Sequence, residues 1–222
     1  NGDPEKMLVP YIPPASESVA AVFRGLGFHA APLPPPDVES LRIGRRSTSG
    51  KECLPMPLTL GSLLQRLERA CAGERFVYLM PSTNGPCRFG VYNLLNNLVL
   101  DRLGWRDRVR IWSPKDTGYF DDLPAGTEML VFAGIAASDF LLQAMLDVRP
   151  VERVHGGANT LYQRYQGELI SLIEKAARGN LSLPSALWEV MNGRLFGVAE
   201  ILQRAGSDFA EIRGLCRLPV VE

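Results

Sequence analysis

The sequence lacks an excess of charge of either sign. Its 222 residues include 24 lysines and arginines and 24 aspartates and glutamates, so the formal net charge is zero. Proteins that bind nucleic acids neutralise phosphates with a basic excess, often gathered on one face. We therefore expect no nucleic-acid partner.

Long apolar runs are also absent. The longest, residues 129–137, is far shorter than the roughly 18 residues that suggest a bilayer-spanning helix. Residues 1–4 are polar and have neither the basic nor the apolar part of a secretory signal. Four cysteines are too few for a disulfide scaffold. We expect no membrane partner and a cytoplasmic location.

Motifs of common catalytic and nucleotide sites are missing too. No Gly-x-Gly-x-x-Gly follows a predicted strand, and no Gly-x4-Gly-Lys-Ser/Thr is present. The two histidines, His29 and His155, lie far apart and lack metal-ligand spacing. An acidic loop contains Asp116, Asp121 and Asp122, but no partner base can be identified. The sequence therefore assigns no catalytic residue.

Strands alternate with helices in the first half of the chain. Helical patterns separate four short apolar runs, residues 7–12, 28–33, 76–79 and 109–112. This order is typical of parallel sheets built from strand–helix–strand units. The sequence therefore predicts an α/β, Rossmann-like fold with a mostly parallel sheet.

The second half is predicted to be mainly helical. Residues 129–136 are apolar on all sides, and periodicity leaves strand and helix open. Helical patterns follow at 161–178 and from Pro184 to Leu202, and Trp188 and Met191 are expected on the buried side of the second. We divide the chain into a Rossmann-like α/β region, residues 1–127, and a mainly helical region, residues 128–222. The first residue is not Met and residues 218–222 look like an opening strand, so we expect a fragment of a larger protein.

Two cysteines lie just before predicted helices. Cys87 follows the turn residues Gly85 and Pro86 after a predicted strand. Cys53 lies just before a helix that is predicted from about residue 58 to residue 72. A thiol at a helix N-terminus is close to free backbone N–H groups and the positive end of the helix dipole, which favour the thiolate. Arg88 and Lys51 add positive charge. Thiolates bind metals and attack electrophiles.

The surrounding motifs resemble those of a known family. Ser-Gly-Lys-Glu-Cys at 49–53 and Gly-Pro-Cys-Arg-Phe-Gly at 85–90 are similar to the paired cysteine motifs of proteins related to the D-component and activase of 2-hydroxyacyl-CoA dehydratases. The resemblance covers most of the chain, to about residue 165. It implies an iron–sulfur cluster, such as [4Fe-4S], held by Cys53 and Cys87 as metal ligands, and electron transfer in acyl-CoA-type chemistry. It also implies further domains or subunits as partners.

Basic and glycine-rich residues beside the cysteines are candidates for cofactor binding. Lys51 and Arg88 can attract an acidic ligand such as a CoA phosphate, and Gly50 and Gly85 can offer backbone N–H groups to an anion. The exposed basic runs, which include Arg45 and Arg46, and the glycine turns are equally consistent with ordinary surface.

The ligand set and the function stay open at this point. A cluster needs three or four ligands, whereas Cys71 is expected on the buried stripe of its helix and Cys216 in a structural role. The chain is either a component of an enzyme that is not active alone, or a non-catalytic docking domain whose cysteines are structural. A thiol enzyme with Cys87 as nucleophile is a third hypothesis.

Overall fold

A four-stranded parallel sheet forms the centre of the first half. The computed structural model describes residues 5–82, 85–114, 123–179 and 181–213. The strand order is β2-β1-β3-β4 and all pairs are parallel. The strands are β1 Lys6–Val9, β2 His29–Pro32, β3 Phe76–Leu79 and β4 Val109–Trp112. The predicted α/β fold with a parallel sheet is confirmed.

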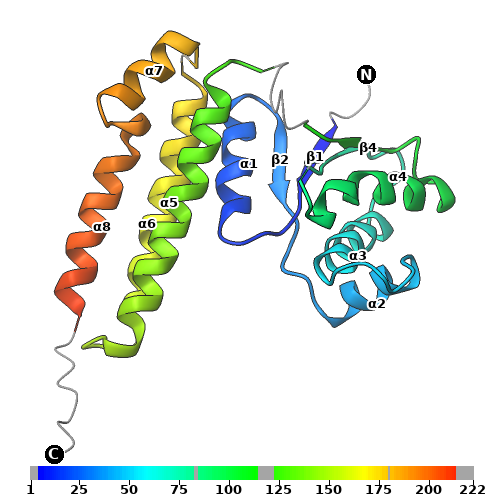
Figure 1. The fold of residues 1–222 in the computed structure, drawn as a ribbon, viewed down its shortest axis with the longest axis horizontal. Helices are drawn as coiled ribbons and strands as arrows, with labels where there is room; N and C mark the ends of the chain where they lie inside the picture. Colours follow the sequence, from blue (N-terminus) through cyan, green and yellow to red (C-terminus); the bar gives the residue numbers. More distant parts are fainter. Residues whose placement is uncertain (1–4, 83–84, 115–122, 180, 214–222) are drawn as a thin grey trace, which may run out of the picture.

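Helices cover both faces of this sheet (Figure 1). From β1 to β2 the chain moves across the sheet in one direction, and from β2 to β3 and from β3 to β4 it moves in the other. Because the crossovers are right-handed, the helix after β1 lies on one face of the sheet and the helices after β2 and β3 lie on the other. Helix α1, Ala15–Gly25, lies on one face. The other face carries α2 Val38–Arg46, α3 Pro55–Glu68 and α4 Tyr92–Arg102, the last preceded by a 3-10 turn η1 Arg88–Val91. All four residues of β3 are consequently buried.

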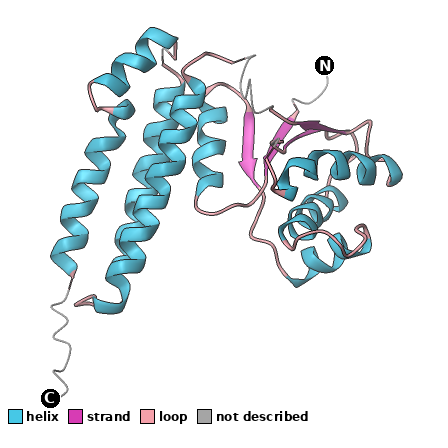
Figure 2. Ribbon diagram, viewed as in Figure 1, coloured by secondary structure: helices cyan, strands magenta, loops and turns pink. Residues whose placement is uncertain are grey.

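The second half is a layer of helices stacked on the outer side of α1 (Figure 2). It contains α5 Thr127–Val148, η2 Arg149–Val151, α6 Gly157–Ala177, α7 Leu183–Met191, η3 Leu195–Gly197 and α8 Val198–Ile212. The predicted helical C-terminal part is confirmed, and residues 129–136 are helix. Helix α1 belongs to both layers, since Phe23 packs toward the sheet and Val22 toward α5 and α6.

Helix α5 is long and apolar. Within the described chain, the stretch Thr127–Val151 is the one helix whose length and composition would allow it to cross a membrane. Here Leu130, Ala137 and Leu141 are buried in one cluster with side chains of α1, α6 and α8. Ser138 Oγ lies 2.7 Å from Ser18 Oγ of α1.

The prediction of a single helix from Pro184 to Leu202 is wrong. The structure breaks it into α7 and α8, with η3 between them and positive φ angles at Gly193 and Gly197. Trp188 and Met191, expected on the buried side, are 51% and 84% exposed. Apolar spacing across a turn looks continuous in sequence, but the turn redirects the following helix.

The expected burial of Cys71 is also wrong. Helix α3 ends at Glu68, before the predicted end near residue 72, and Cys71 is exposed. The Cys71 N–H donates to a carboxylate oxygen of Glu74 at 2.8 Å, so this segment forms a turn into β3 instead of another helical turn. Gly73, with φ of 88°, accommodates that turn.

Glu74 connects this turn to two other elements, and we expect its charge to stabilise the fold. Its carboxylate accepts from Lys6 Nζ of β1, from Arg66 of α3 at 3.4 Å and from the Cys71 N–H. The Lys6 contact is the main cause that lowers the pKa of Glu74 from 4.5 to about 2. The contribution is therefore complete above about pH 4.5 and is lost as the pH falls toward 2.

Glu74→Gln should accordingly lower the Tm by a few degrees at pH 7. In thermal unfolding followed by circular dichroism, the difference from wild type should shrink steadily between pH 5 and pH 2, about the range set by the two pKa values. Glu211→Gln, an exposed carboxylate of α8, is the control and should show little change. A Tm difference that is equal at pH 7 and pH 3 would refute the electrostatic explanation.

Candidate functional site

The carboxyl end of the sheet brings together the segments that follow β1 and β3. The chain leaves β1 toward α1 on one face, whereas it leaves β3 toward α4 on the other. Ligands of open α/β sheets bind outside the strand ends at such a reversal. Cys87 lies in the segment after β3, directly before η1, as the sequence predicts.

Cys53 reaches the same region through the α2–α3 pair. Helix α2 begins at an Asp37 cap, whose carboxylate accepts from the Ser40 N–H at 2.7 Å. The two helices are in backbone contact, because a Cβ added to Gly61 would lie 1.7 Å from the Ser40 carbonyl oxygen. One added to Gly44 would lie 1.8 Å from that of Pro57. The connecting residues 47–54, which include Cys53, are held by this contact.

Glu52 folds the loop on itself. Its carboxylate accepts from the Ser49 N–H at 3.1 Å, the Ser49 hydroxyl at 2.9 Å and the Gly50 N–H at 2.9 Å. These hydrogen bonds lower the pKa of Glu52 to about 2, and the bond from the Ser49 backbone N–H is the largest cause. The Gly50 N–H is thus engaged inside the loop, and its role in anion binding stays a prediction.

The two cysteine loops are in contact with each other. An Arg88 guanidinium nitrogen donates to the Lys51 carbonyl at 2.8 Å, so the residue after Cys87 is bonded to the loop of Cys53. Cys53 Sγ lies 2.7 Å from the Tyr92 hydroxyl. Cys53 is partly buried and Cys87 is exposed. Two motifs far apart in sequence therefore form one surface.

Tyr92 is the residue of α4 that contacts the Cys53 thiol. It is buried in the first turn of α4, and burial is the main cause that raises the pKa of its hydroxyl. The hydrogen bond with Cys53 and the charges of Cys53 and Cys87 raise this pKa further. The hydroxyl therefore keeps its proton and can donate to the Cys53 sulfur. Sequence reasoning missed Tyr92, since no periodicity or motif connects it to Cys53.

The predicted basic and glycine residues lie around this pair in exposed positions. Lys51, Arg88 and Gly85 are all exposed, and Arg88 donates a hydrogen bond across the two loops. Arg45 and Arg46 occupy the exposed last turn of α2. Positive charge at a helix C-terminus complements the dipole, so these two arginines also have a local structural role.

Two apolar cavities lie close to residues that neighbour or contact the cysteines, although neither cysteine lines them. One, of about 290 Å³, is bordered by Tyr11, Ile12, Leu54, Leu58, Phe89 and Tyr92. The other, of about 360 Å³, lies between the ends of β1 and β3 and the start of α5, and it also includes Ile12 and Phe89. Both are concave, mostly apolar surfaces beside polar groups, the usual character of small-molecule sites.

The donor set for a metal is incomplete within the described part of the chain. No group of three or more His, Cys, Asp or Glu side chains there is arranged to hold a metal ion. Cys53 and Cys87 supply two thiolates, and an iron–sulfur cluster takes three or four protein ligands. Cys216 and the acidic residues Asp116, Asp121 and Asp122 lie outside the described residues.

Neither histidine belongs to this surface. His29 is the first residue of β2, so it lies at the opposite end of the parallel sheet from the cysteine loops. His155 is exposed in the turn before α6, 3.5 Å from the Glu152 carboxylate. Of the candidate ligands that the sequence predicts, Cys53 and Cys87 lie on two loops that are bonded to each other.

No protein-family model matches the chain, and neither a curated protein nor a solved structure shows significant similarity to it. The family resemblance therefore stays a prediction that depends on the two cysteine motifs.

Proposed function

We propose that the chain is an iron–sulfur-binding domain of a protein similar to 2-hydroxyacyl-CoA dehydratases and their activases. Cys53 and Cys87 would contribute two thiolate ligands, and the bound cluster would supply single-electron chemistry for an acyl-CoA-type substrate. The observation that carries this proposal is the contact between the two cysteine segments, which the Cys53–Tyr92 and Arg88–Lys51 hydrogen bonds make.

The remaining ligands would come from outside the described residues, from another domain or subunit of the larger protein. The exposure of Cys87 is consistent with a site completed by a second surface. Arg88 would offset the negative charge of the thiolates, and Tyr92 would orient Cys53 by a hydrogen bond to its sulfur. The cavities that share Ile12 and Phe89 are apolar enough to take an acyl group.

Iron and sulfide analysis after anaerobic reconstitution tests the proposal. The wild-type protein should bind both and absorb in the visible range, whereas Cys53→Ser and Cys87→Ser should each lose most of the iron. Cys71→Ser is the matched control, because Cys71 is an exposed free cysteine outside the site. Reconstitution includes an excess of a small thiol, which can take the place of ligands from another domain or subunit. A folded wild type that takes up no iron under these conditions, or variants that retain it fully, would contradict the proposal.

Tyr92→Phe tests the role of the hydrogen bond to Cys53. Loss of a group that orients a metal ligand typically costs about 10- to 100-fold in metal affinity. We expect a loss in this range for iron retention against a chelator, with little loss of fold because the ring stays in place. Phe89, whose ring packs on Tyr92 at 5.1 Å, provides the control variant Phe89→Leu. Equal iron retention by wild type and Tyr92→Phe would show that Tyr92 has no role in holding the metal.

A docking domain with structural cysteines is the second candidate, and α4 favours it. Val91 at the end of η1 and Leu94 and Leu98 of α4 are 56%, 60% and 64% exposed and have the spacing of one helix face. Asn96 is instead fully buried, with no hydrogen-bond partner for its amide among the described residues. Such an apolar stripe suits contact with another protein. A folded wild type that is free of iron after reconstitution would favour this candidate.

A further inference from the structure

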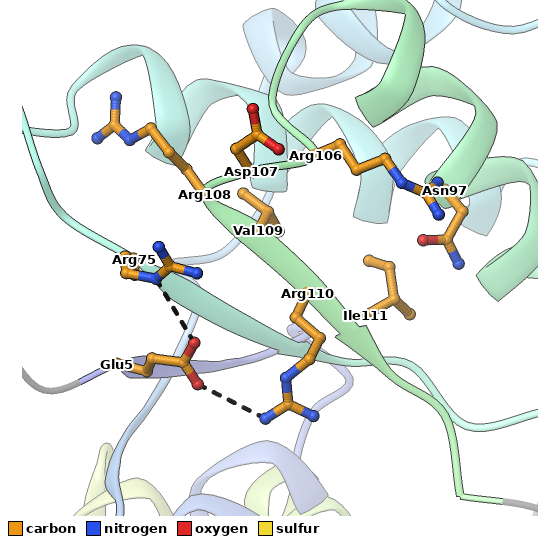
Figure 3. Close-up of a pocket in the computed structure, with 9 residues that line it drawn as sticks. All are labelled: Glu5, Arg75, Asn97, Arg106, Asp107, Arg108, Val109, Arg110 and Ile111. Carbon is orange, nitrogen blue, oxygen red and sulfur yellow. Dashed lines mark ion pairs between the residues drawn. The ribbon is translucent and has the colours of Figure 1, made fainter.

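Arginines surround the free edge of the sheet. Among the described strands β4 pairs only with β3, which makes it an edge strand. The open groove along it has a volume of about 540 Å³. Figure 3 shows Arg75, Arg110 and Glu5 on one side of β4 and Arg106 with Asn97 of α4 on the other, and Asp107 also lines the groove. Neither cysteine of the proposed site, nor Tyr92, lines this groove.

The backbone of β4 offers pairing positions on its outer side. The Phe76 N–H donates to the Arg108 carbonyl and the Met80 N–H to the Trp112 carbonyl, both at 2.8 Å. Successive residues of a strand present their backbone groups to opposite sides. Arg108, Arg110 and Trp112 therefore turn toward β3, while the N–H and C=O of Ile111 turn away from it. The Val109 N–H is already bonded to the Trp105 carbonyl at 2.9 Å.

The arginines near this edge are weakly held. Arg75 and Arg110 share Glu5, but their nitrogens lie 3.8 and 3.5 Å from its carboxylate oxygens, and the two side chains are 59% and 61% exposed. Strong charge-assisted hydrogen bonds are about 2.7–2.9 Å long. Exposed pairs of this kind contribute little, so other carboxylates can replace Glu5. Arg108 is different, because it donates to the Glu74 and Cys71 carbonyls.

We propose that the β4 edge binds an extended, acidic segment of a partner protein as a fifth strand. The segment would pair with the outward backbone groups of Ile111 and the Val109 carbonyl. Because side chains of a strand alternate between faces, acidic residues at every second position would face Arg110 on one face, and those between could reach Arg106 on the other. Arg75 precedes β3, so β4 lies between it and the added strand. In the doubly wound order 2-1-3-4-5, a strand occupies this position beside β4.

A small anion fits these observations less well than a strand. The arginines lie on both faces of β4 rather than around one point, and the groove follows the strand. Charged side chains on edge strands can also serve only to prevent sheet-to-sheet association. That role requires no affinity for any peptide, so a binding experiment separates it from the proposal.

The probe is a fluorescently labelled peptide of alternating glutamate and valine, added to the full chain and followed by anisotropy. We expect saturable binding that weakens with salt, and no binding of the matching lysine–valine peptide. Arg106→Gln and Arg110→Gln should each weaken binding by about 2- to 5-fold. Arg149→Gln, an exposed arginine of η2, should leave it unchanged. Thermal unfolding checks that each variant is folded.

A second peptide tests backbone pairing. The same glutamate–valine sequence with methylated backbone nitrogens keeps its charge but cannot donate along a strand, and it should lose most of its binding. Absence of binding by the unmodified peptide, equal binding by the methylated one, or unchanged affinity in both arginine variants would each overturn the proposal.

Discussion

Phe23→Ala is expected to lower the free energy of unfolding by about 3–5 kcal/mol, the range for truncating a buried phenylalanine. Phe23 is fully buried on α1, the helix that both layers share. Its ring packs edge-on against Trp112 at the end of β4, with centroids 5.3 Å apart, and against Phe28 before β2 at 5.8 Å. Truncation would leave a cavity between α1 and the sheet.

Urea-induced unfolding measures this loss. Phe140→Ala, which truncates the same side chain type at a position of α5 that is 66% exposed, should change stability by no more than about 0.5 kcal/mol. Because α1 contacts both layers, fluorescence and far-UV circular dichroism should report one shared transition for Phe23→Ala. A loss below about 1 kcal/mol would show that the interface with the sheet repacks without Phe23.

Gly61→Ala is expected to cost about 1–3 kcal/mol or more, because the new methyl group has no space. Its Cβ would lie 1.7 Å from the Ser40 carbonyl oxygen, and a backbone carbonyl cannot rotate away as a side chain can. Helices α2 and α3 must separate to relieve the contact. The loop that carries Cys53 joins these helices, so its position should change with them.

Two readouts follow this change. Denaturant unfolding gives the stability, and mass spectrometry gives the alkylation rate of Cys53, which should rise as the thiol moves away from Tyr92. Gly167→Ala is the matched control, since nothing lies within 4 Å of a Cβ there and alanine favours the helix by about 0.5–1 kcal/mol. If Gly61→Ala were as stable as wild type, the close helix contact would be wrong.

Much of the fold could be predicted because each strand is a compact apolar run followed by a clear break. The run at β3, ended by residues 80–86, located the Cys87 segment correctly at the carboxyl end of a strand. Cys53 could not be placed, because α2 stands between it and β2 and the position of the loop depends on the α2–α3 contact. Tyr92 is found only once that packing is known.

The buried side of α4 was predicted wrongly for a related reason. Its apolar spacing places residues 91, 94, 95, 98, 99 and 103 on one helix face, but the structure buries a different side of the helix. The structure buries Val99 and Leu100 with Asn96, while Leu94 and Leu98 face outward. Cys71 was misplaced because apolar spacing continues past the point where Glu74 ends the helix by accepting from the Cys71 N–H.

The account depends most on the claim that Cys53 and Cys87 form one metal-binding site, and cobalt(II) titration tests it most directly. A single cobalt ion needs only this pair of thiolates and solvent, so the test does not depend on ligands from elsewhere. We predict one cobalt ion per chain with a thiolate-to-metal absorption band that Cys71→Ala retains. The band should be lost or strongly reduced in both Cys53→Ala and Cys87→Ala. A band of unchanged intensity in either of these two variants, or no band in the wild type, would contradict the account.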